Sequence, residues 1–464
     1  MHFLRTMISE LSTINHLPPL EVFLRIPPEA KQVSFLLSDG SADSRWSILT
    51  WDPVETVNGN DQWSMVNSRT RCGVNDQMFQ QSVGSLLSEK LQKRNKRSTE
   101  NLPFLGGAIG AIDYEYGYEL LGIRNGEDTL LRSPSFEEQV DPRLQKHLVE
   151  FSFYDQALVY DHHQKQWWGV NLNGENMTWC RDAINRVSTD AKHPRLELHP
   201  TWDFDRYKKS FDFIHDNIRR GEIYQACLTF PFTGKPVDHP RALFYSLAKK
   251  KAAPMAAYLE QSQRTIVSLS PERFISWNGS TLETKPIKGT RKRGITLDED
   301  IRLKNELLSD EKEKAELCMI TDLLRNDMAR VSKAGTVKVL EHQAVQETPN
   351  VWHTYSHIRS QTKDDISAWE ILESMFPGGS ISGCPKKRAM ELLAEAEDSP
   401  RGIYTGCIGY ISDHGSMDLN IAIRTLEQDK NEIRAGFGGG IVYDSEAKVE
   451  YQECFDKARL FQST

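Results

Sequence analysis

Two pairs of glutamates stand three residues apart in segments with a helical pattern, a spacing that places each pair on one face of a helix. The pairs are Glu313 with Glu316 and Glu450 with Glu453. Carboxylate oxygens are the ligands that Mg²⁺ prefers, and the ion keeps other positions for water and an anionic substrate. The sequence therefore offers a magnesium site if the two helices face each other. The alternative, two solvated faces with pairs such as Glu453 and Lys457, stays open.

Lys288 and Glu272 offer a nucleophile and a proton donor. Strand alternation over 281–290 places Lys288 on the face of Leu282 and Thr284, as for a core residue. A lysine held there is paired or becomes nucleophilic by desolvation, although an ordinary lysine at a strand end fits the pattern too. Glu272 suits a general acid or base, or a simple salt bridge. Prolines beside both residues interrupt strand pairing, so register leaves open whether they meet.

Two glycine-rich segments are able to bring backbone N–H groups close to a ligand. Residues 376–388 run from a loop into a helix, whose N-terminus favours an anion. They form no Walker A loop, because Cys384 stands where lysine would follow Gly383. Residues 436–442 follow a strand, but Ile441 stands where a dinucleotide fingerprint needs glycine. Tight packing and a bound ligand explain the three consecutive glycines equally well.

The elements that must carry these groups mix strands with helices. An amphipathic helix is expected from an N-cap at Asp203 or Asp205 to Arg220, ending at Gly221. Beyond it, strands are expected over 265–269, 281–285, 406–412, 420–426 and 432–435, and helices over 297–330, 368–375, 385–397 and 446–461. Turn signals beside the strand patterns are typical of hairpins. We therefore expect antiparallel sheets flanked by helices, with a boundary near residue 195 in a linker over 190–200.

Length and charge exclude several classes of protein. The chain has 464 residues, 39% of them hydrophobic and 26% charged, which is typical of globular rather than disordered proteins. A net charge of −8 excludes nucleic-acid or membrane binding through a global positive field. There is no apolar run of membrane-span length and no secretory signal, so we expect a cytoplasmic protein. The seven cysteines form no C-x-x-C pair, which argues against a disulfide framework and a thiolate zinc site.

The motifs taken together resemble the chorismate-utilising enzymes. The resemblance is thin in the N-terminal half, where it rests on Phe104–Gly107, and dense from Trp202 onward. It is carried by Gly221-x-Ile223-Tyr224-Gln225, Ser270-Pro-Glu272-Arg-Phe, Pro286-Ile-Lys-Gly-Thr290, Asp322-Leu-x-Arg325-Asn326-Asp327, Phe376-Pro-Gly-Gly-Ser-Ile-Ser-Gly383 and Ile423-Arg424-Thr425. It implies an α+β fold, a two-sheet antiparallel β-sandwich with flanking helices. Residues 1–195 would contribute to the sandwich and, as in some relatives, a pocket for tryptophan, and residues 196–464 would form the chorismate-binding catalytic region.

Lysine at the position of Lys288 is typical of the aminodeoxychorismate synthases of this family, whereas anthranilate synthases typically carry alanine. The resemblance therefore implies amination of chorismate to 4-amino-4-deoxychorismate, the precursor of the 4-aminobenzoate of folate. It implies that Lys288 attacks C2 of chorismate covalently and that Glu272 protonates the departing hydroxyl. Anthranilate or isochorismate chemistry on chorismate is one alternative, and a non-catalytic chorismate-binding subunit is another.

The substrates and partners follow from the same resemblance. Chorismate and ammonia are the expected substrates, with neither nucleic acid nor membrane as a partner. The sequence contains no glutaminase with a cysteine nucleophile and a His-Glu pair. Ammonia is therefore expected from a separate glutamine amidotransferase subunit, bound transiently, or from solution.

The resemblance also assigns the remaining site residues. Glu316 and Glu453 are the expected ligands of Mg²⁺, the one cofactor expected, with Glu313 and Glu450 flanking them. Contacts to chorismate are expected from a set spread over several motifs: Gly289, Thr290, His353, Tyr404, Arg424, Gly438, Gly439 and Gly440. The chain departs from the family at Ala226-Cys227, where a polar contact is altered. Leu36-Leu37-Ser38-Asp39 departs from the inhibitor-binding motif of anthranilate synthases, so feedback inhibition by tryptophan is not expected.

Overall fold

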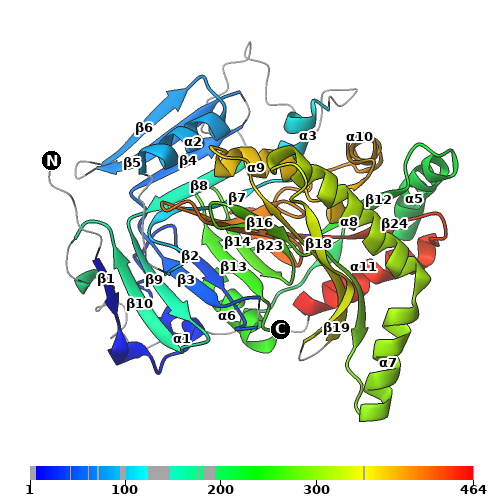
Figure 1. The fold of residues 1–464 in the computed structure, drawn as a ribbon, viewed down its shortest axis with the longest axis horizontal. Helices are drawn as coiled ribbons and strands as arrows, with labels where there is room; N and C mark the ends of the chain where they lie inside the picture. Colours follow the sequence, from blue (N-terminus) through cyan, green and yellow to red (C-terminus); the bar gives the residue numbers. More distant parts are fainter. Residues whose placement is uncertain are drawn as a thin grey trace.

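The architecture is a sandwich of two large antiparallel sheets with helices on the outside (Figure 1). The computed structural model describes residues 7–41, 43–60, 62–70, 73–94, 101–123, 147–174, 177–180, 194–348 and 351–462. The α+β class and the two-sheet sandwich expected from the sequence are confirmed. In this part of the chain, no helix is long and apolar enough to cross a membrane.

Sheet 1 contains twelve strands in the described part of the chain. Along the sheet they are β1 (Met7–Glu10), β10 (Gln166–Asn171), β9 (Gln156–Asp161), β3 (Trp46–Thr50), β2 (Ser34–Leu37), β13 (Met255–Glu260), β14 (Thr265–Ser270), β23 (Thr425–Gln428), β24 (Ile433–Ile441), β12 (Gln225–Gly234) and β11 (His199–Pro200), with β20 (Gly383–Cys384) also pairing with β12. Long strands β12 and β24 lie side by side and provide one wall of the site described below.

Sheet 2 also contains twelve strands among the described residues. Their order is β17 (Ile287–Lys292), β19 (Val351–Gln361), β16 (Thr281–Thr284), β15 (Arg273–Trp277), β22 (Met417–Ile421), β21 (Cys407–Ser412), β7 (Gly107–Ile112), β8 (Val149–Tyr154), β4 (Glu55–Gly59), β5 (Ser64–Thr70) and β6 (Gly73–Phe79), with β18 (Lys338–Glu347) also pairing with β19. Strands from both sides of residue 195 pair in both sheets, β2 with β13 and β7 with β21. Residues 190–193 of the expected linker lie outside the described residues.

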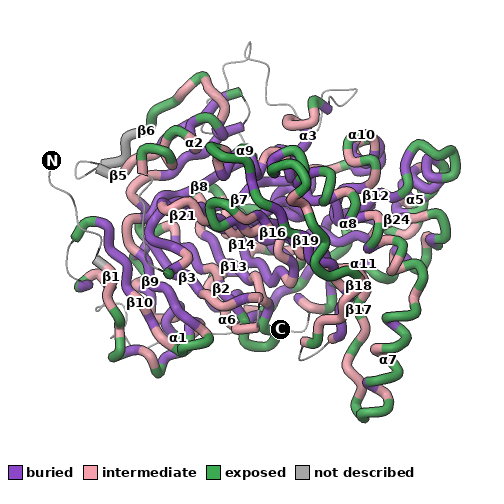
Figure 2. Tube along the Cα trace, in the orientation of Figure 1, coloured by how far each residue is buried: buried purple, intermediate pink, exposed green. Residues whose placement is uncertain are grey.

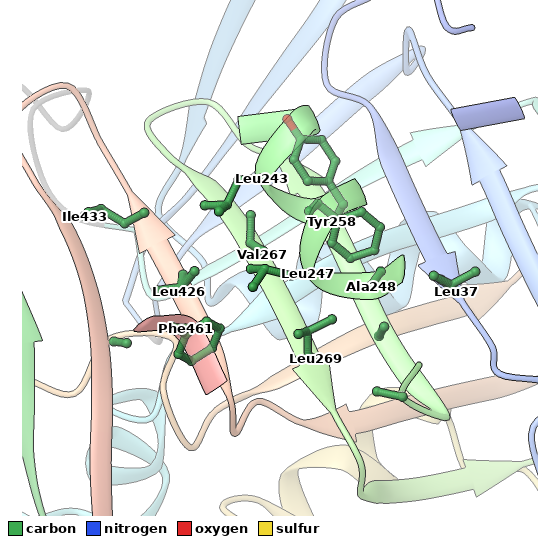
Figure 3. Close-up of a cluster of buried hydrophobic side chains, with 14 of the residues drawn as sticks. Leu37, Leu243, Leu247, Ala248, Tyr258, Val267, Leu269, Leu426, Ile433 and Phe461 are labelled. Atoms are coloured by element: carbon green, nitrogen blue, oxygen red, sulfur yellow. The ribbon is translucent and has the colours of Figure 1, made fainter. Parts of the chain in front are cut away.

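Helices cover the outer face of each sheet. Those packed on sheet 1 are α1 (Pro19–Phe23), α5 (Phe204–Arg219), α6 (Pro240–Lys250), α10 (Lys386–Ala396) and α11 (Ala447–Gln462). Those on the side of sheet 2 are α2 (Val83–Arg94), α3 (Tyr116–Leu121), α7 (Leu297–Ser309), α8 (Glu311–Val331) and α9 (Ala368–Met375). Two short 3-10 helices are η1 (Ser12–Ile14) and η3 (Gly379–Ile381). Leu243 and Leu247 of α6 pack against Val267 and Leu269 of β14 (Figure 3).

A third apolar layer lies between the two sheets. It joins Ala257 and Ile266 of sheet 1 to Ile109 and Ile408 of sheet 2, all four at most 1% exposed. Figure 2 shows this burial along the central strands, while α7 at the periphery is largely exposed. Polar groups that enter the inter-sheet layer leave bulk water, so their charge states are set by the protein.

Helix α5 confirms the expected N-cap, because the Asp203 carboxylate accepts a hydrogen bond from the N–H of Arg206 at 2.9 Å. Two expected elements were wrong in extent. The single helix over 297–330 is two helices, because Asp310 leaves helical geometry and its carboxylate caps α8 by accepting from the N–H of Glu313 at 3.1 Å. The single strand over 420–426 is split, since β22 belongs to sheet 2 and β23 to sheet 1.

Arg401 links segments that are distant in sequence. It is 5% exposed, and its guanidinium donates to both carboxylate oxygens of Glu397, at 2.8 and 2.7 Å. It also donates to the carbonyls of Cys227 at 2.6 Å and Ile381 at 3.0 Å, and lies 4.1 Å above the ring of Tyr114. A buried arginine is tolerated because these acceptors replace its hydration.

We predict that Arg401→Ala lowers the free energy of unfolding by about 3–5 kcal/mol, because it leaves the Glu397 carboxylate buried without its counter-charge. Urea unfolding followed by tryptophan fluorescence measures the change. The control Arg302→Ala removes an exposed pair with Glu306 and is expected to cost about 0.5 kcal/mol or less. Equally small losses in the two variants would contradict the role given to Arg401.

Candidate active site

The site forms where the chain crosses twice between the sheets. Glu272 lies in the passage from β14 to β15, and Arg424 lies in the passage from β22 to β23. The crossings are bonded to each other, since the N–H of Ile421 donates to the carbonyl of Glu272 at 3.0 Å and the N–H of Leu269 donates to that of Arg424 at 3.0 Å. Two residues separated by 152 positions in the chain therefore enter the same space.

Glu272 is a buried acid. It is 5% exposed, and its Oε1 accepts from the hydroxyl of Ser380 at 3.2 Å and from the N–H of Ile287 at 3.5 Å. Burial raises the pKa of the carboxyl above its ordinary value, while the charges of Lys288 and Arg424 oppose that rise. Such an acid can keep a proton at a higher pH than an exposed glutamate can.

Lys288 reaches the same place from β17. The residue is half-buried, and its Nζ donates to the main-chain carbonyl of Ser380 at 3.3 Å. The hydroxyl of Ser380 donates to Glu272, so the Lys288 amine and the Glu272 carboxyl group both contact the same residue. The question that strand register left open is thereby answered: Lys288 and Glu272 belong to one site.

Gly289 and Thr290 continue β17 beside β19. Gly289 has φ +78°, and a Cβ at this position would stand 2.0 Å from Oε2 of Glu313, so only glycine fits. The Thr290 hydroxyl and Nδ1 of His353 lie 2.8 Å apart. Burial, together with the charge of Arg424, lowers the pKa of His353 to about 4, so its imidazole is neutral at pH 7.

Arg424 presents a cation to this space. It adopts φ 51°, a left-handed conformation that is uncommon outside glycine. The residue is exposed to solvent, yet desolvation by the surrounding protein lowers the pKa of its guanidinium, and Glu272 opposes that effect. A guanidinium that is reachable and incompletely solvated is suited to bind a carboxylate in a bidentate manner.

The glycines of β24 form a strand wall with no side chains on one face. Gly438 pairs with Thr229 and Gly440 with Cys227, and paired residues of antiparallel strands share a face. Lys457 donates to the carbonyl of Gly438 at 2.7 Å. Two residues before Gly438 in β24, Gly436 packs against Tyr404. A Cβ on Gly436 would stand 2.1 Å from the ring of Tyr404. Tyr404 thus lies against the wall, and Cys227 occupies the position where the family departure was noted.

Two of the predicted carboxylates, Glu450 and Glu453, lie on the other side of this wall, while Glu313 lies against Gly289 of β17. Oε2 of Glu450 lies 3.1 Å from the position a Cβ on Gly439 would take, and that of Glu453 lies 4.0 Å from it. Burial raises the pKa of Glu316, and the negative charges of Glu450 and Glu313 raise it further, against Lys288 and Lys312. Oε1 of Glu453 is paired with Lys457 at 2.7 Å, as the solvated-face alternative expects.

The donor set fits Mg²⁺ in chemistry. Oε2 of Glu313 is buried with no hydrogen-bond partner, and burial, followed by the charges of Glu450 and Glu313, raises the pKa of Glu316, so a cation placed here would relieve both costs. Among the described residues, no three carboxylate, imidazole or thiolate groups form a finished metal site. Two carboxylates completed by water and substrate oxygens are a common arrangement for Mg²⁺.

Ser380 is the contact residue that the sequence does not single out. A serine after two glycines is typical of a turn, and its contacts to Lys288 and Glu272 span 92 and 108 residues of sequence. The only available signal is its place within 376–388.

A separate cavity of about 150 Å³ lies between the sheets, lined in part by Ser44, Trp46, Met255 and Tyr410. Tryptophan binding in the N-terminal part stays a prediction.

Comparison with known proteins agrees with this geometry. The family model described as chorismate binding enzyme matches residues 34–463. The chain is 35% identical over 434 residues to "Aminodeoxychorismate synthase component 1" of Escherichia coli (strain K12), covering 91% of each chain, and 29% identical over 472 residues to "Anthranilate synthase component 1" of Lactococcus lactis, covering 97% and 98%. The crystal structure of anthranilate synthase component I from Streptococcus pneumoniae superposes with a TM-score of 0.76 at 27% identity, over 96% of this chain and 97% of that one. With a family match over nearly its whole length and a site assembled from the matching motifs, the chain belongs to the chorismate binding enzymes.

Proposed function

We propose that this protein aminates chorismate at C4 to give 4-amino-4-deoxychorismate. The observation that carries the proposal is the meeting of the Lys288 amine and the buried Glu272 acid on Ser380. The similarity to relatives named aminodeoxychorismate synthase component 1, from Escherichia coli and Bacillus subtilis, supports the same activity. The product is the precursor of the 4-aminobenzoate of folate.

Chorismate carries two carboxylates, and the site offers complementary groups for them. Arg424 supplies a guanidinium, and Gly438 and Gly440 place no side chain of their own on their face of β24, where the amide of Gln225 lies against Gly440. The neutral imidazole of His353 and the hydroxyl of Thr290 hold each other beside β17, next to Lys288. We propose Glu316 and Glu453, flanked by Glu313 and Glu450, as the residues that would hold Mg²⁺, which when bound supplies positive charge for a substrate carboxylate.

The first half of the proposed reaction replaces the hydroxyl by a lysine bond. Nζ of Lys288, as the neutral amine, bonds to C2 and releases a proton to water, the two ring double bonds shift toward C4, and the C4–O bond breaks. The leaving oxygen takes the proton of Glu272 and departs as water. Burial suits Glu272 to this step because it raises the pKa of the acid that must arrive protonated.

The second half installs the amino group. Ammonia bonds to C4 and gives a proton to the Glu272 carboxylate, the double bonds shift back, and the Nζ–C2 bond breaks as Nζ regains its proton. The sum is chorismate plus ammonia giving aminodeoxychorismate plus water. We propose a separate glutamine amidotransferase subunit as the ammonia source, in line with the words "component 1" in the names of the relatives.

Two other functions use parts of the same site. Anthranilate or isochorismate chemistry would need no lysine nucleophile, so Lys288 beside the acid favours amination at C4. A non-catalytic subunit would need chorismate-binding groups but neither a nucleophile nor a buried acid. The presence of both groups in one site therefore favours an enzyme.

We predict that the purified chain, given chorismate, Mg²⁺ and ammonium, forms 4-amino-4-deoxychorismate, and that Lys288→Ala loses at least about 100-fold in kcat because the nucleophile is gone. Mass spectrometry of the products measures this. The control Lys285→Ala removes a nearby lysine that is paired with Asp43 and should stay within about twofold. Anthranilate as the main product would refute the proposed reaction.

Glu272→Gln is expected to lower kcat by about 10²–10⁴-fold, because an amide cannot protonate the leaving oxygen. In the parent enzyme, kcat should fall as the pH rises through the elevated pKa of Glu272, since only the protonated acid donates. The variant should lack that alkaline limb. A pH profile of kcat tests both points, with Glu283→Gln on β16 as the control expected to keep the parent profile.

Removal of divalent metal with a chelator is expected to abolish turnover, and Mg²⁺ should restore it. Glu316→Gln should raise the Mg²⁺ concentration for half-maximal activity by about tenfold or more, because one anionic ligand is lost. The control Glu311→Gln changes an exposed glutamate of the same helix, paired with Lys314, and should match the parent. Full activity in excess chelator would disprove the metal assignment.

A further inference from the structure

Ser380 occupies a fixed position between the two sheets. It lies in η3 (Gly379–Ile381), within the glycine-rich segment that joins α9 to α10, and is 7% exposed. The buried guanidinium of Arg401 donates to the carbonyl of Ile381 at 3.0 Å, which holds the turn from the next residue. The main chain at Ser380 is therefore held in place beside Glu272 and Lys288.

The contacts of Ser380 treat the two oxygens of Glu272 differently. Oε1 accepts from the Ser380 hydroxyl at 3.2 Å and from the N–H of Ile287 at 3.5 Å. Among the described residues, no hydrogen bond to Oε2 is found. The carbonyl of Ser380 accepts from Nζ of Lys288 at 3.3 Å. One residue thus engages one oxygen of the acid, leaves the other free and keeps the amine close by.

We propose that Ser380 is a positioning residue that assigns the two oxygens of Glu272 to separate tasks in the amination of chorismate. The inference rests on the proposed function. With Oε1 occupied as an acceptor, the proton of the acid resides on Oε2, the oxygen that is free to face the C4 hydroxyl. When that proton passes to the leaving oxygen and the C4–O bond breaks, Glu272 becomes a carboxylate. The Ser380 hydroxyl then stabilises the charge on Oε1.

The charged groups around Glu272 set the expected pH effect. Lys288 of β17 and Arg424 of the second crossing both lower its pKa, against the burial that raises it. The hydroxyl of Ser380 also lowers this pKa, because it donates to the charged form. Removing the hydroxyl therefore raises the pKa of Glu272, and the alkaline limb of kcat should move to higher pH.

The decisive variant is Ser380→Ala, which deletes the hydroxyl but keeps the carbonyl that contacts Lys288. With saturating ammonium in place of a partner subunit, we expect kcat to fall about 10–100-fold, as for loss of a hydrogen bond to a charged group. KM for chorismate should stay within about twofold, and the alkaline limb should shift upward. Ser380→Thr, which keeps a hydroxyl, should restore both the parent kcat and the parent position of the alkaline limb in the pH profile of kcat.

The matched control is Ser382→Ala in the same segment. Its hydroxyl donates to the carbonyl of Gly378 at 2.9 Å and, in the described part of the chain, makes no hydrogen bond to Glu272 or Lys288, so its loss should leave the alkaline limb of the pH profile in place. Titration of Glu272 is also followed without substrate, by the infrared carboxylic C=O band that Glu272→Gln removes. A raised infrared pKa in Ser380→Ala, restored by threonine, supports the role of Ser380 whichever product the enzyme makes.

Two results would overturn the proposal. One is an infrared pKa of Glu272 that is the same in Ser380→Ala as in the parent. The other is an equal shift in Ser382→Ala, which would show that any disturbance of the loop has this effect. Neither result depends on the identity of the product, so the role of Ser380 and the proposed function fail separately.

Discussion

The buried guanidinium of Arg401 is the interaction on which the site depends. Its acceptors lie on Glu397, the residue that caps the C-terminal end of α10, on β12 and on the turn that contains Ser380. Glu397, its counter-ion, accepts in turn from the N–H and hydroxyl of Thr229, both at 3.0 Å. Strand β12 and the turn that contains Ser380 are therefore both hydrogen-bonded to the Arg401–Glu397 ion pair. Because that pair is enclosed, its geometry is held far more tightly than that of an exposed salt bridge.

The inter-sheet environment shifts the pKa values of Glu272 and His353 in opposite directions. Burial raises the pKa of Glu272 and lowers that of His353, because in each case it disfavours the charged form. Both groups are pushed toward neutrality by the same cause. The cations Lys288 and Arg424 then limit how far the acid is shifted. An anionic substrate can therefore enter among groups that present donors and cations to it, in a protein whose net charge is −8.

Local pattern predicted much of this fold and of the site. The helical pattern within 297–330 is present in α8, where Leu317, Ile320 and Leu324 are buried at helical spacing, and the N-cap at Asp203 is present. The expected strand over 420–426 was wrong because strand-like residues continue on both sides of a change of sheet, and the change itself depends on long-range pairing.

The contacts of Ser380 could not be predicted for a similar reason. Its partners are brought to it by two separate sheets, and nothing in a glycine-rich turn specifies which distant strands will arrive there. The residue types at Lys288 and Glu272 indicated the chemistry. Their meeting depended on the crossings between the sheets, which no local spacing encodes.

The left-handed backbone of Arg424 has a consequence for how this chain tolerates change. A non-glycine residue at φ 51° typically carries about 1–2 kcal/mol of conformational strain. Glycine there would relieve the strain but remove the guanidinium that acts on Glu272. At this position the most stable residue and the most useful residue differ, so selection for thermal stability alone would erode activity first at the crossing.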